Sequence, residues 1–213
     1  MSRFFILLGG DLIRTPRLEA QLAGSRVIAA DSGIRHAAML DVMPELWVGD
    51  FDSTPADLLD DYSGIPRDVF PPDKDKTDGE LAIAAALERG ATSLVLAGAF
   101  GGARADHAYL HLALAVRLAE DGTPVVLTSG HQEGRPLLPG TTGFDYPDGT
   151  VFSVIGFSEL SGLTETGAKW PLDHVEVPFG SSLTLSNEVR SSLRITLDSG
   201  RAMLIAHPYP SDI

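Results

Sequence analysis

The chain has 213 residues, 44% of them hydrophobic, with no cysteine and a formal net charge of −13 at pH 7. The lack of cysteine excludes disulfide bonds, thiolate metal sites and cysteine nucleophiles. The negative charge argues against nucleic acid or a membrane as a partner, and no apolar run reaches the roughly 18 residues of a membrane span, so we expect a cytoplasmic protein.

The first 130 residues alternate short apolar runs with helix-like stretches. We expect strands over residues 4–8, 26–30, 46–48, 68–70, 93–97 and 125–128. Helices are expected between them, over residues 16–23, 34–40, 55–61, 78–89 and 106–120. Strands without polar and apolar alternation suit a sheet covered on both faces, and alternating strands and helices imply parallel pairing. The sequence therefore predicts an α/β domain with a mostly parallel sheet and helices on both faces.

The chain changes character after residue 130. Residues 131–142 are rich in Gly, Pro and Thr, which is typical of a linker. Beyond them, turns separate short β-prone runs at residues 151–156, 183–185, 192–197 and 202–206. We therefore expect an α/β domain over residues 1–130, a linker over 131–142 and a small all-β sandwich domain over 143–213.

Acidic residues are concentrated between Asp50 and Glu80, a stretch that contains ten acidic and only three basic residues. One cluster is Gly49-Asp50-Phe51-Asp52-Ser53. Carboxylates at this density must be solvated, protonated or neutralised by a hard cation that prefers oxygen ligands. If the backbone stays extended, Asp50 and Asp52 point to the same side and can share one Mg²⁺. The alternative is a turn in which an Asp side chain bonds its own backbone.

The second cluster, Asp73-Lys74-Asp75-Lys76-Thr77-Asp78, opens a predicted helix. Thr77 can cap that helix, and Glu80 three residues later can complete a capping box. Capping does not explain Asp78, which we expect to be a third metal ligand. The helix N-terminus, with Lys76 and Thr77, is also a place for anionic oxygens.

Polar or glycine-rich segments follow each of the first five expected strands: Gly9-Gly10, Asp31-Ser32-Gly33, Asp50-Phe51-Asp52, the loop of residues 73–78, and Gly98-Ala99-Phe100-Gly101-Gly102. In open α/β sheets, ligands bind at the carboxyl ends of the strands, so these segments should meet at one edge. The last segment leads to Arg104, whose planar guanidinium suits phosphate, as do the backbone amides of a glycine-rich loop. An ordinary tight turn would also explain the glycines.

The C-terminal half contains two further segments of interest. Trp170 lies in Gly167-Ala168-Lys169-Trp170-Pro171-Leu172, where it is either a core residue or a platform for an aromatic ligand. Ser186-Asn187-Glu188 has the composition of a turn with cap-like hydrogen bonds.

Taken together, these motifs resemble the thiamine pyrophosphokinase family, also called thiamine diphosphokinase. The pieces follow the family's order and cover nearly the whole chain, with Arg104-x-Asp106-His107 between the acidic clusters and the Trp170 segment. The resemblance implies Mg²⁺-dependent transfer of a diphosphoryl group from ATP to the hydroxyl of thiamine, giving thiamine diphosphate and AMP. It also implies a homodimer whose active site combines the N-terminal domain of one subunit with the C-terminal domain of the other.

The resemblance also assigns roles to residues. Asp50, Asp52 and Asp78 would be the catalytic residues that hold the metal. The expected ATP contacts are Asp31, Ser32, Gly33, Lys76, Thr77, Gly98, Arg104 and His107. The expected thiamine contacts are Asp106, Trp170, Ser186 and Asn187. The family usually has Asp-Gly-Gly where this chain has Asp31-Ser32-Gly33. A serine at this position can adopt fewer backbone conformations than a glycine.

Two other functional classes share part of the pattern. A metal-dependent phosphohydrolase or nucleotidyl transferase could use the same aspartate clusters. A nucleotide- or thiamine-sensing module could bind these ligands without turnover, although acidic clusters so placed argue for catalysis.

Overall fold

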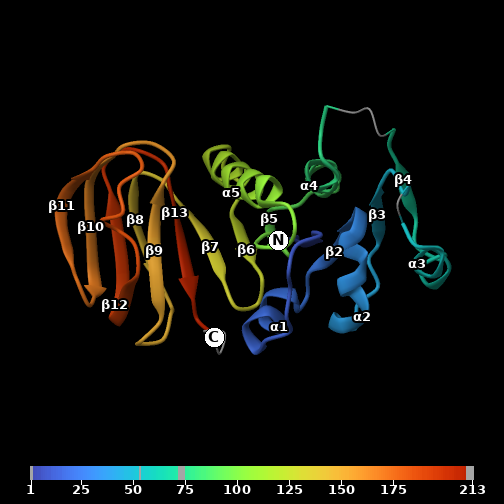
Figure 1. Cartoon of the computed structure of the whole chain (residues 1–213), viewed down its shortest axis with the longest axis horizontal. Coiled ribbons are helices and arrows are strands. Elements are labelled where there is room, and N and C mark those ends of the chain that lie inside the picture. The colour runs from blue at the N-terminus through green and yellow to red at the C-terminus, as the bar shows by residue number, and fades with distance from the viewer. Residues whose placement is uncertain (1, 53, 72–74, 210–213) are drawn as a thin grey trace. The chain divides into compact units, whose positions relative to one another are not determined.

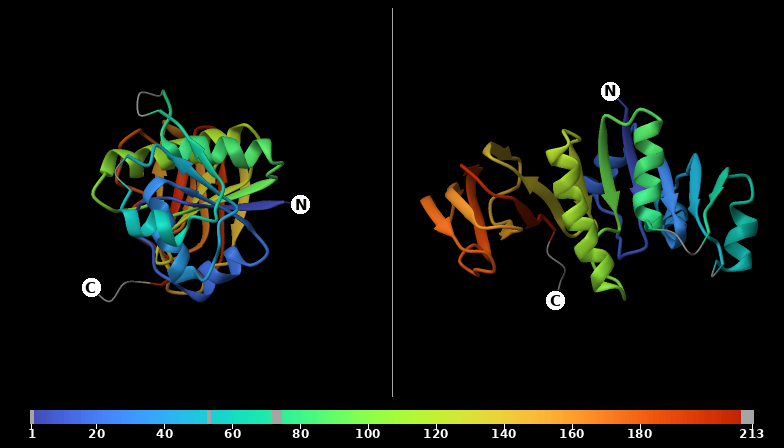
Figure 2. Two further views of the ribbon diagram at one scale, coloured as in Figure 1. Left: turned by 90° about the vertical axis from the view of Figure 1, so that its right-hand side faces the viewer. Right: turned by 90° about the horizontal axis from the view of Figure 1, so that it is seen from above.

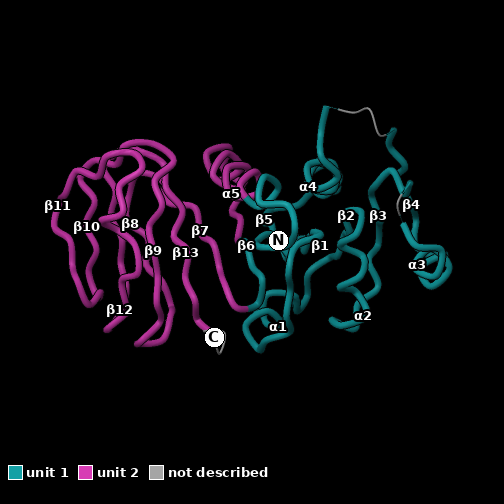
Figure 3. Tube along the Cα trace, in the orientation of Figure 1, with its two compact units in different colours: residues 1–108, 127–130 teal, residues 109–126, 131–213 magenta. Residues whose placement is uncertain are grey.

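The computed structural model describes residues 2–52, 54–71 and 75–209, and the chain divides into two compact units (Figure 3). Unit 1 comprises residues 1–108 and 127–130, and unit 2 comprises residues 109–126 and 131–213. Helix α5 (Ala105–Glu120) and strand β6 (Val125–Thr128) each contribute residues to both units. No helix in the described ranges is long and apolar enough to cross a membrane.

Unit 1 is built on a parallel sheet with the strand order β4-β3-β2-β1-β5 (Figure 1). Its strands are β1 (Arg3–Leu7), β2 (Arg26–Ala30), β3 (Leu46–Gly49), β4 (Arg67–Val69) and β5 (Ser93–Ala97). In the central register, Phe5 lies between Val27 and Val95. The strands expected from the sequence in this half, β6 included, are confirmed to within one residue at each end.

Helices cover both faces of this sheet, as expected. They are α1 (Pro16–Leu22), the 3-10 helix η1 (Asp31–Arg35), α2 (His36–Leu40), α3 (Ala56–Asp61) and α4 (Asp78–Glu88). Figure 2 shows α4 on the opposite side of the sheet from α1 and α2. Successive strand residues point to opposite faces, so the complete burial of Phe4, Phe5, Ile6 and Leu7 requires cover on both sides.

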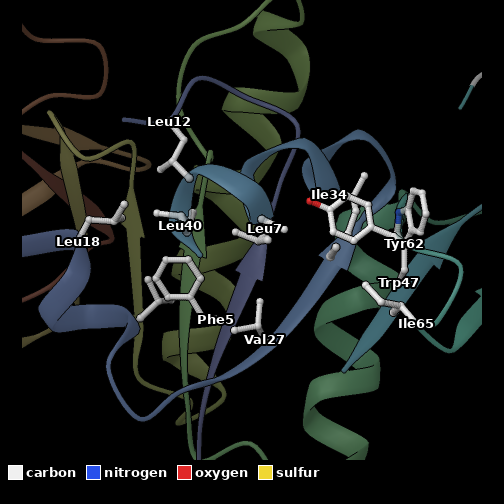
Figure 4. Packing of buried hydrophobic residues seen from close by; sticks show 14 residues of the cluster. Phe5, Leu7, Leu12, Leu18, Val27, Ile34, Leu40, Trp47, Tyr62 and Ile65 are labelled. Carbon is white, nitrogen blue, oxygen red and sulfur yellow. The ribbon is translucent and has the colours of Figure 1, made fainter. Parts of the chain in front are cut away.

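The face that carries Phe5 and Leu7 packs into a continuous apolar cluster with residues of α1 and α2 (Figure 4). Trp47 on β3 is fully buried at one end of this cluster. Its ring contacts Phe51 and Tyr62 edge-on, with centroids 4.9 and 6.3 Å away. This packing fixes the end of β3, where the first acidic segment begins.

Unit 2 is rich in antiparallel strands. They are β7 (Glu133–Leu137), β8 (Gly140–Phe144), β9 (Val151–Gly156), β10 (Leu160–Ala168), β11 (Leu172–Val177), β12 (Asn187–Leu197) and β13 (Ala202–His207). The start of β12 pairs with β9, which also pairs with β13, and its later residues pair with β8 and β10. Strand β12 therefore joins two sheets, and a buried apolar cluster includes residues of both.

The structure differs from the sequence-based expectations for this half in several places, among them β10 and β11, which were not expected, and β12, which begins five residues earlier than expected. Most of residues 131–142, expected to be a linker, form β7 and part of β8, which pair with β13 and β12. Residues 183–185 form a turn instead of a strand, closed by the Leu185 amide, which donates to the Ser182 carbonyl at 3.2 Å, and the buried Thr184 hydroxyl donates to the carbonyl of Val154 at 2.6 Å. Unit 2 also includes residues 109–120 of α5, which lie outside the expected β domain of residues 143–213.

Candidate active site

The loops that follow β1, β2 and β5 pack closely together at the carboxyl edge of the unit 1 sheet. Gly33 lies against the carbonyl of Leu7 and Gly10 against the carbonyls of Gly98 and Phe100, and none of these contacts leaves room for a Cβ atom. Gly98 itself has a φ of 75°. Gly33 and Gly98, both predicted to contact nucleotide, are thus required for the packing of this edge.

Two side chains of unit 1 hold the Gly9-Gly10 segment in place. The Arg35 guanidinium donates to the carbonyls of Gly9 and Gly10, and His36 Nε2 donates to the Gly10 carbonyl at 2.9 Å. Burial lowers the pKa of His36, which favours the neutral ring. The Gly10 amide donates to the Gly98 carbonyl at 3.0 Å, so this loop is joined to the loop after β5.

Asp31 directly follows β2 and adopts a left-handed backbone conformation with a φ of 44°. Aspartate tolerates this conformation better than most residues do. The Trp47 indole N–H donates to the Asp31 carbonyl at 2.9 Å and holds it there. Gly49 packs against the Asp31 backbone, so the ends of β2 and β3 lie side by side. The left-handed residue of this segment is Asp31, and Ser32 does not need a glycine-like conformation.

The segment from Asp50 to Asp52 forms a turn, not an extended strand. Phe51 has a φ of 61°, and the Asp52 amide donates to Asp50 Oδ1 at 3.3 Å. The extended backbone that would point both carboxylates to the same side is therefore absent. A left-handed phenylalanine is strained, and contacts with the Trp47 ring and the Arg67 guanidinium offset that strain.

The acidic side chains at this edge do not form a complete metal cage. Within the described residues, no three His, Cys, Asp or Glu side chains are grouped so that they could hold a metal ion, and this applies to Asp50, Asp52 and Asp78. Asp31 and Asp50 follow neighbouring strands and offer oxygen donors only. An all-oxygen set suits Mg²⁺, which takes one or two carboxylates and completes its shell with water and substrate phosphate. The residues present fit such a partial site.

Helix α4 begins with the predicted capping box. The Thr77 hydroxyl accepts from the Glu80 amide at 3.3 Å, and the Glu80 carboxylate accepts from the Thr77 amide at 3.2 Å. This hydroxyl is therefore used by the helix, while the side chain of Lys76 is exposed just before the cap. Ser53, Asp73 and Lys74, which belong to the acidic motifs, lie outside the described residues.

The glycine-rich loop after β5 contacts an acidic side chain. Gly101 and Gly102 have φ values of 66° and 83°, and the Gly102 amide donates to Asp11 Oδ2 at 2.9 Å. Beyond it, Arg104 donates twice to Asp106, at 3.0 and 2.6 Å. These hydrogen bonds hold the pKa of Asp106 well below its usual range. The Arg104–Asp106 pair is exposed, so replacing its hydrogen bonds by bonds to a ligand costs little free energy.

Trp170 is not a core residue, since it is 57% exposed. It lies between the end of β10 and the start of β11, and Lys169 Nζ sits 4.6 Å from the centroid of its ring. Ser186 is exposed as well, and its left-handed backbone donates to the Ser153 hydroxyl at 3.0 Å. Both residues are accessible to a ligand.

Asn187, in contrast, is buried and bonded within the protein. Its Oδ1 accepts from the amides of Trp170 and Glu188 at 3.1 and 2.9 Å. Its Nδ2 donates to the Trp170 carbonyl at 2.8 Å and to Glu165 Oε2 at 2.9 Å. The amide thus holds the backbone of Trp170 from both sides.

Comparison with known proteins identifies the family. The model "Thiamin pyrophosphokinase, catalytic domain" matches residues 21–127, and "Thiamin pyrophosphokinase, vitamin B1 binding domain" matches residues 142–202. A thiamine pyrophosphokinase of Bacillus subtilis (strain 168) is 30% identical over 182 residues, which is 84% of each chain. The chain belongs to the thiamin pyrophosphokinase family. This confirms the resemblance found in the sequence motifs.

Solved structures of thiamin pyrophosphokinases share the fold. The enzyme from Bacillus subtilis matches with a TM-score of 0.83 at 25% identity, covering 97% of this chain and 99% of that one. The enzyme from Geobacillus thermodenitrificans matches with a TM-score of 0.80 at 28% identity, covering 100% and 99%. The family's reaction is the ATP-dependent transfer of a diphosphoryl group to thiamine, so the chain is a diphosphotransferase.

Four residues of these networks are not among the site residues predicted from the sequence: Asp11, Arg35, His36 and Glu165. The sequence could have indicated Asp11, because it directly follows Gly9-Gly10, one of the segments expected at the edge of the sheet. The roles of Arg35 and His36 depend on the carbonyls of a loop 25 or 26 residues away. Glu165 looks like an exposed strand residue between two threonines, and only the fold brings it to Asn187.

Proposed function

We propose that the chain uses Mg²⁺ to transfer the diphosphoryl group of ATP to the hydroxyl of thiamine, giving thiamine diphosphate and AMP. One observation carries the proposal: both domain matches coincide with candidate sites of the matching chemistry. The catalytic-domain match spans the acidic and glycine-rich loops at the sheet edge. The vitamin B1-binding match spans Trp170, Ser186 and Asn187.

In this proposal the two halves of the chain bind different substrates. Residues 1–130 bind ATP and the metal, and residues 143–213 bind thiamine. The active protein is a homodimer in which each site uses the first half of one subunit and the second half of the other. Exposed apolar side chains on unit 2 support an interface with a second copy: Phe179, Leu183 and Leu185 are 70%, 58% and 48% exposed.

Asp50 and Asp52 would hold Mg²⁺, with Asp78 as a third ligand once ATP is bound. The ion would supply positive charge to the phosphate oxygens. Asp31, beside the end of β3, would orient the nucleotide or a metal-bound water. The contacts of Trp47 with the Asp31 carbonyl and the Phe51 ring support this assignment, because they hold the backbone that carries Asp31 and Asp50 before the substrate arrives.

The phosphates of ATP would be contacted by exposed cations and by backbone amides of the same edge. Lys76 and Arg104 are exposed there and can neutralise phosphate oxygens. The remaining ATP contacts would come from Ser32, Gly33, Thr77, Gly98 and His107. Positioning and charge stabilisation of this kind account for most of the catalysis of phosphoryl transfer.

Thiamine would bind mainly through exposed residues, drawn from the first half of one subunit and the second half of the other. Asp106 would hold the pyrimidine ring after exchanging its bond with Arg104, and Trp170 would stack on the ligand rings. The exposure of Trp170 supports this role, as does the affinity of an indole face for a cationic ring such as thiazolium. Ser186 and Asn187 would complete this part of the pocket.

The proposal is tested by incubating the purified protein with ATP, Mg²⁺ and thiamine and separating AMP from ADP. We expect AMP to form only when both thiamine and Mg²⁺ are present. Release of ADP or diphosphate without thiamine would indicate a phosphohydrolase or nucleotidyl transferase instead. Tight binding of thiamine or ATP without any product would indicate a sensing module.

A further inference from the structure

Glu165 is a buried carboxylate to which the proposed chemistry gives no role. It is fully buried on β10, opposite Leu172 of β11 and Ile195 of β12. Its Oε2 accepts from Asn187 Nδ2 at 2.9 Å, while its Oε1 has no hydrogen-bond partner among the described residues. Burial raises the pKa of Glu165 to about 7. A carboxylate so placed is costly to the fold, and its one bond leads to Asn187.

The backbone at Trp170 depends on Asn187, because the last main-chain hydrogen bond to β12 before it is that of the Lys169 amide, which donates to the Glu188 carbonyl at 2.8 Å. The ladder between β10 and β12 shifts register between Thr166 and Ala168, at Gly167, whose φ is 78°. Trp170 lies beyond the end of β10 and before the start of β11. Its amide donates to Asn187 Oδ1, and its carbonyl accepts from Asn187 Nδ2.

The orientation of the Asn187 amide is fixed by its partners. Two backbone amides, those of Trp170 and Glu188, need the same acceptor, so Oδ1 must face them. One hydrogen of Nδ2 then meets the Trp170 carbonyl, and the other requires an acceptor in a buried place. Glu165 provides it. Without that acceptor, the buried donor would be unsatisfied and the amide would tend to turn away.

We propose that Glu165 is a positioning residue for thiamine, because it holds the Asn187 amide and so fixes the backbone from which the Trp170 indole projects. This inference rests on the proposed function, in which Trp170 stacks on thiamine. Glu165 does not touch the ligand. It acts through two hydrogen-bonded steps, of which the one from Glu165 to Asn187 is buried, and its loss should affect the use of thiamine but not the use of ATP.

Kinetic measurements on two variants test this role. Glu165→Met keeps the side-chain length and removes the acceptor, and it should raise the KM for thiamine about tenfold, the size of effect expected when one buried donor is left without an acceptor. The KM for ATP and kcat should change by no more than about twofold. Glu165→Gln retains an acceptor for Asn187 and should restore the KM for thiamine to within about twofold of the unaltered protein.

Glu133→Met is the matched control. Glu133 is also a buried carboxylate of unit 2, but it bonds Arg135 and Tyr146, at 2.8 Å each. Its loss should lower the thermal stability without changing the KM for thiamine selectively. Hydrogen exchange at the Trp170 amide provides a readout without turnover, and we expect it to accelerate in Glu165→Met only.

Two results would overturn the inference. One is a parallel change of both KM values in Glu165→Met and Glu133→Met, which would show general destabilisation. The other is unchanged exchange at Trp170 in Glu165→Met. A third combination is faster exchange at Trp170 in Glu165→Met together with no AMP formation by the unaltered protein. That result would show that the proposed function is wrong, and the role of Glu165 in thiamine binding would be wrong as well.

Discussion

Asp50→Asn should give a folded protein whose thiamine-dependent formation of AMP is reduced by at least about 10²-fold. The fold should survive because an asparagine Oδ1 can still accept the hydrogen bond that the Asp52 amide donates to Asp50. Catalysis should not survive, because the substitution removes a negative charge from the proposed Mg²⁺ site. The measurement is kcat at saturating ATP, Mg²⁺ and thiamine, with circular dichroism as the check on folding.

Asp57→Asn is the control for this variant. Asp57 lies in the first turn of α3 and is exposed, so removing its charge changes the net charge of the acidic stretch equally without touching the proposed site. It should retain nearly all activity. If Asp50→Asn formed AMP with an unchanged dependence on Mg²⁺, Asp50 would not be a metal ligand.

Trp170→Ala should raise the KM for thiamine about tenfold to a hundredfold, the range expected when one aromatic stacking partner is removed. The KM for ATP should stay nearly constant, since the proposed ATP contacts lie in the other half of the chain. Folding should be little affected because Trp170 is 57% exposed and its backbone is held by Asn187. Steady-state kinetics with each substrate varied in turn separates the two constants.

Trp170→Phe retains an aromatic face and should recover most of the lost affinity for thiamine. Equal KM values for thiamine in the alanine variant and the unaltered protein would rule out the stacking role. Mixed dimers of the Asp50→Asn and Trp170→Ala variants test the shared site as well. The assay uses thiamine near the KM of the unaltered protein, where Trp170→Ala alone is nearly inactive. If each site draws on both subunits, one site of the mixed dimer is intact and activity partly returns, whereas sites built from a single subunit would show no recovery.

The α/β half could be predicted from the sequence because its signals are local. Strands β2 and β5, buried over all but their first residue, appear as short apolar runs, and the capping box of Thr77 and Glu80 marks the start of α4. Parallel pairing then places the loops after the strands at one edge. The motif order was specific enough to indicate the family that the comparisons confirm.

The local geometry of the acidic turn was not predictable. Phe51 is left-handed because Trp47 and Arg67 pack on its ring, and these contacts belong to the tertiary structure. Several strands of unit 2 were missed for a related reason. Gly162 and Gly167 interrupt the pattern of β10, with φ values of 64° and 78°, and only its partner strands make it a strand.

The most direct test of the proposed function follows the phosphorus atoms of ATP that carries a radioactive label at one position. With thiamine and Mg²⁺ present, label at the β position and label at the γ position should both appear in thiamine diphosphate, in equal yield, while label at the α position stays in AMP. Transfer of the γ label alone, or release of either label to water at a rate independent of thiamine, would contradict diphosphoryl transfer to thiamine.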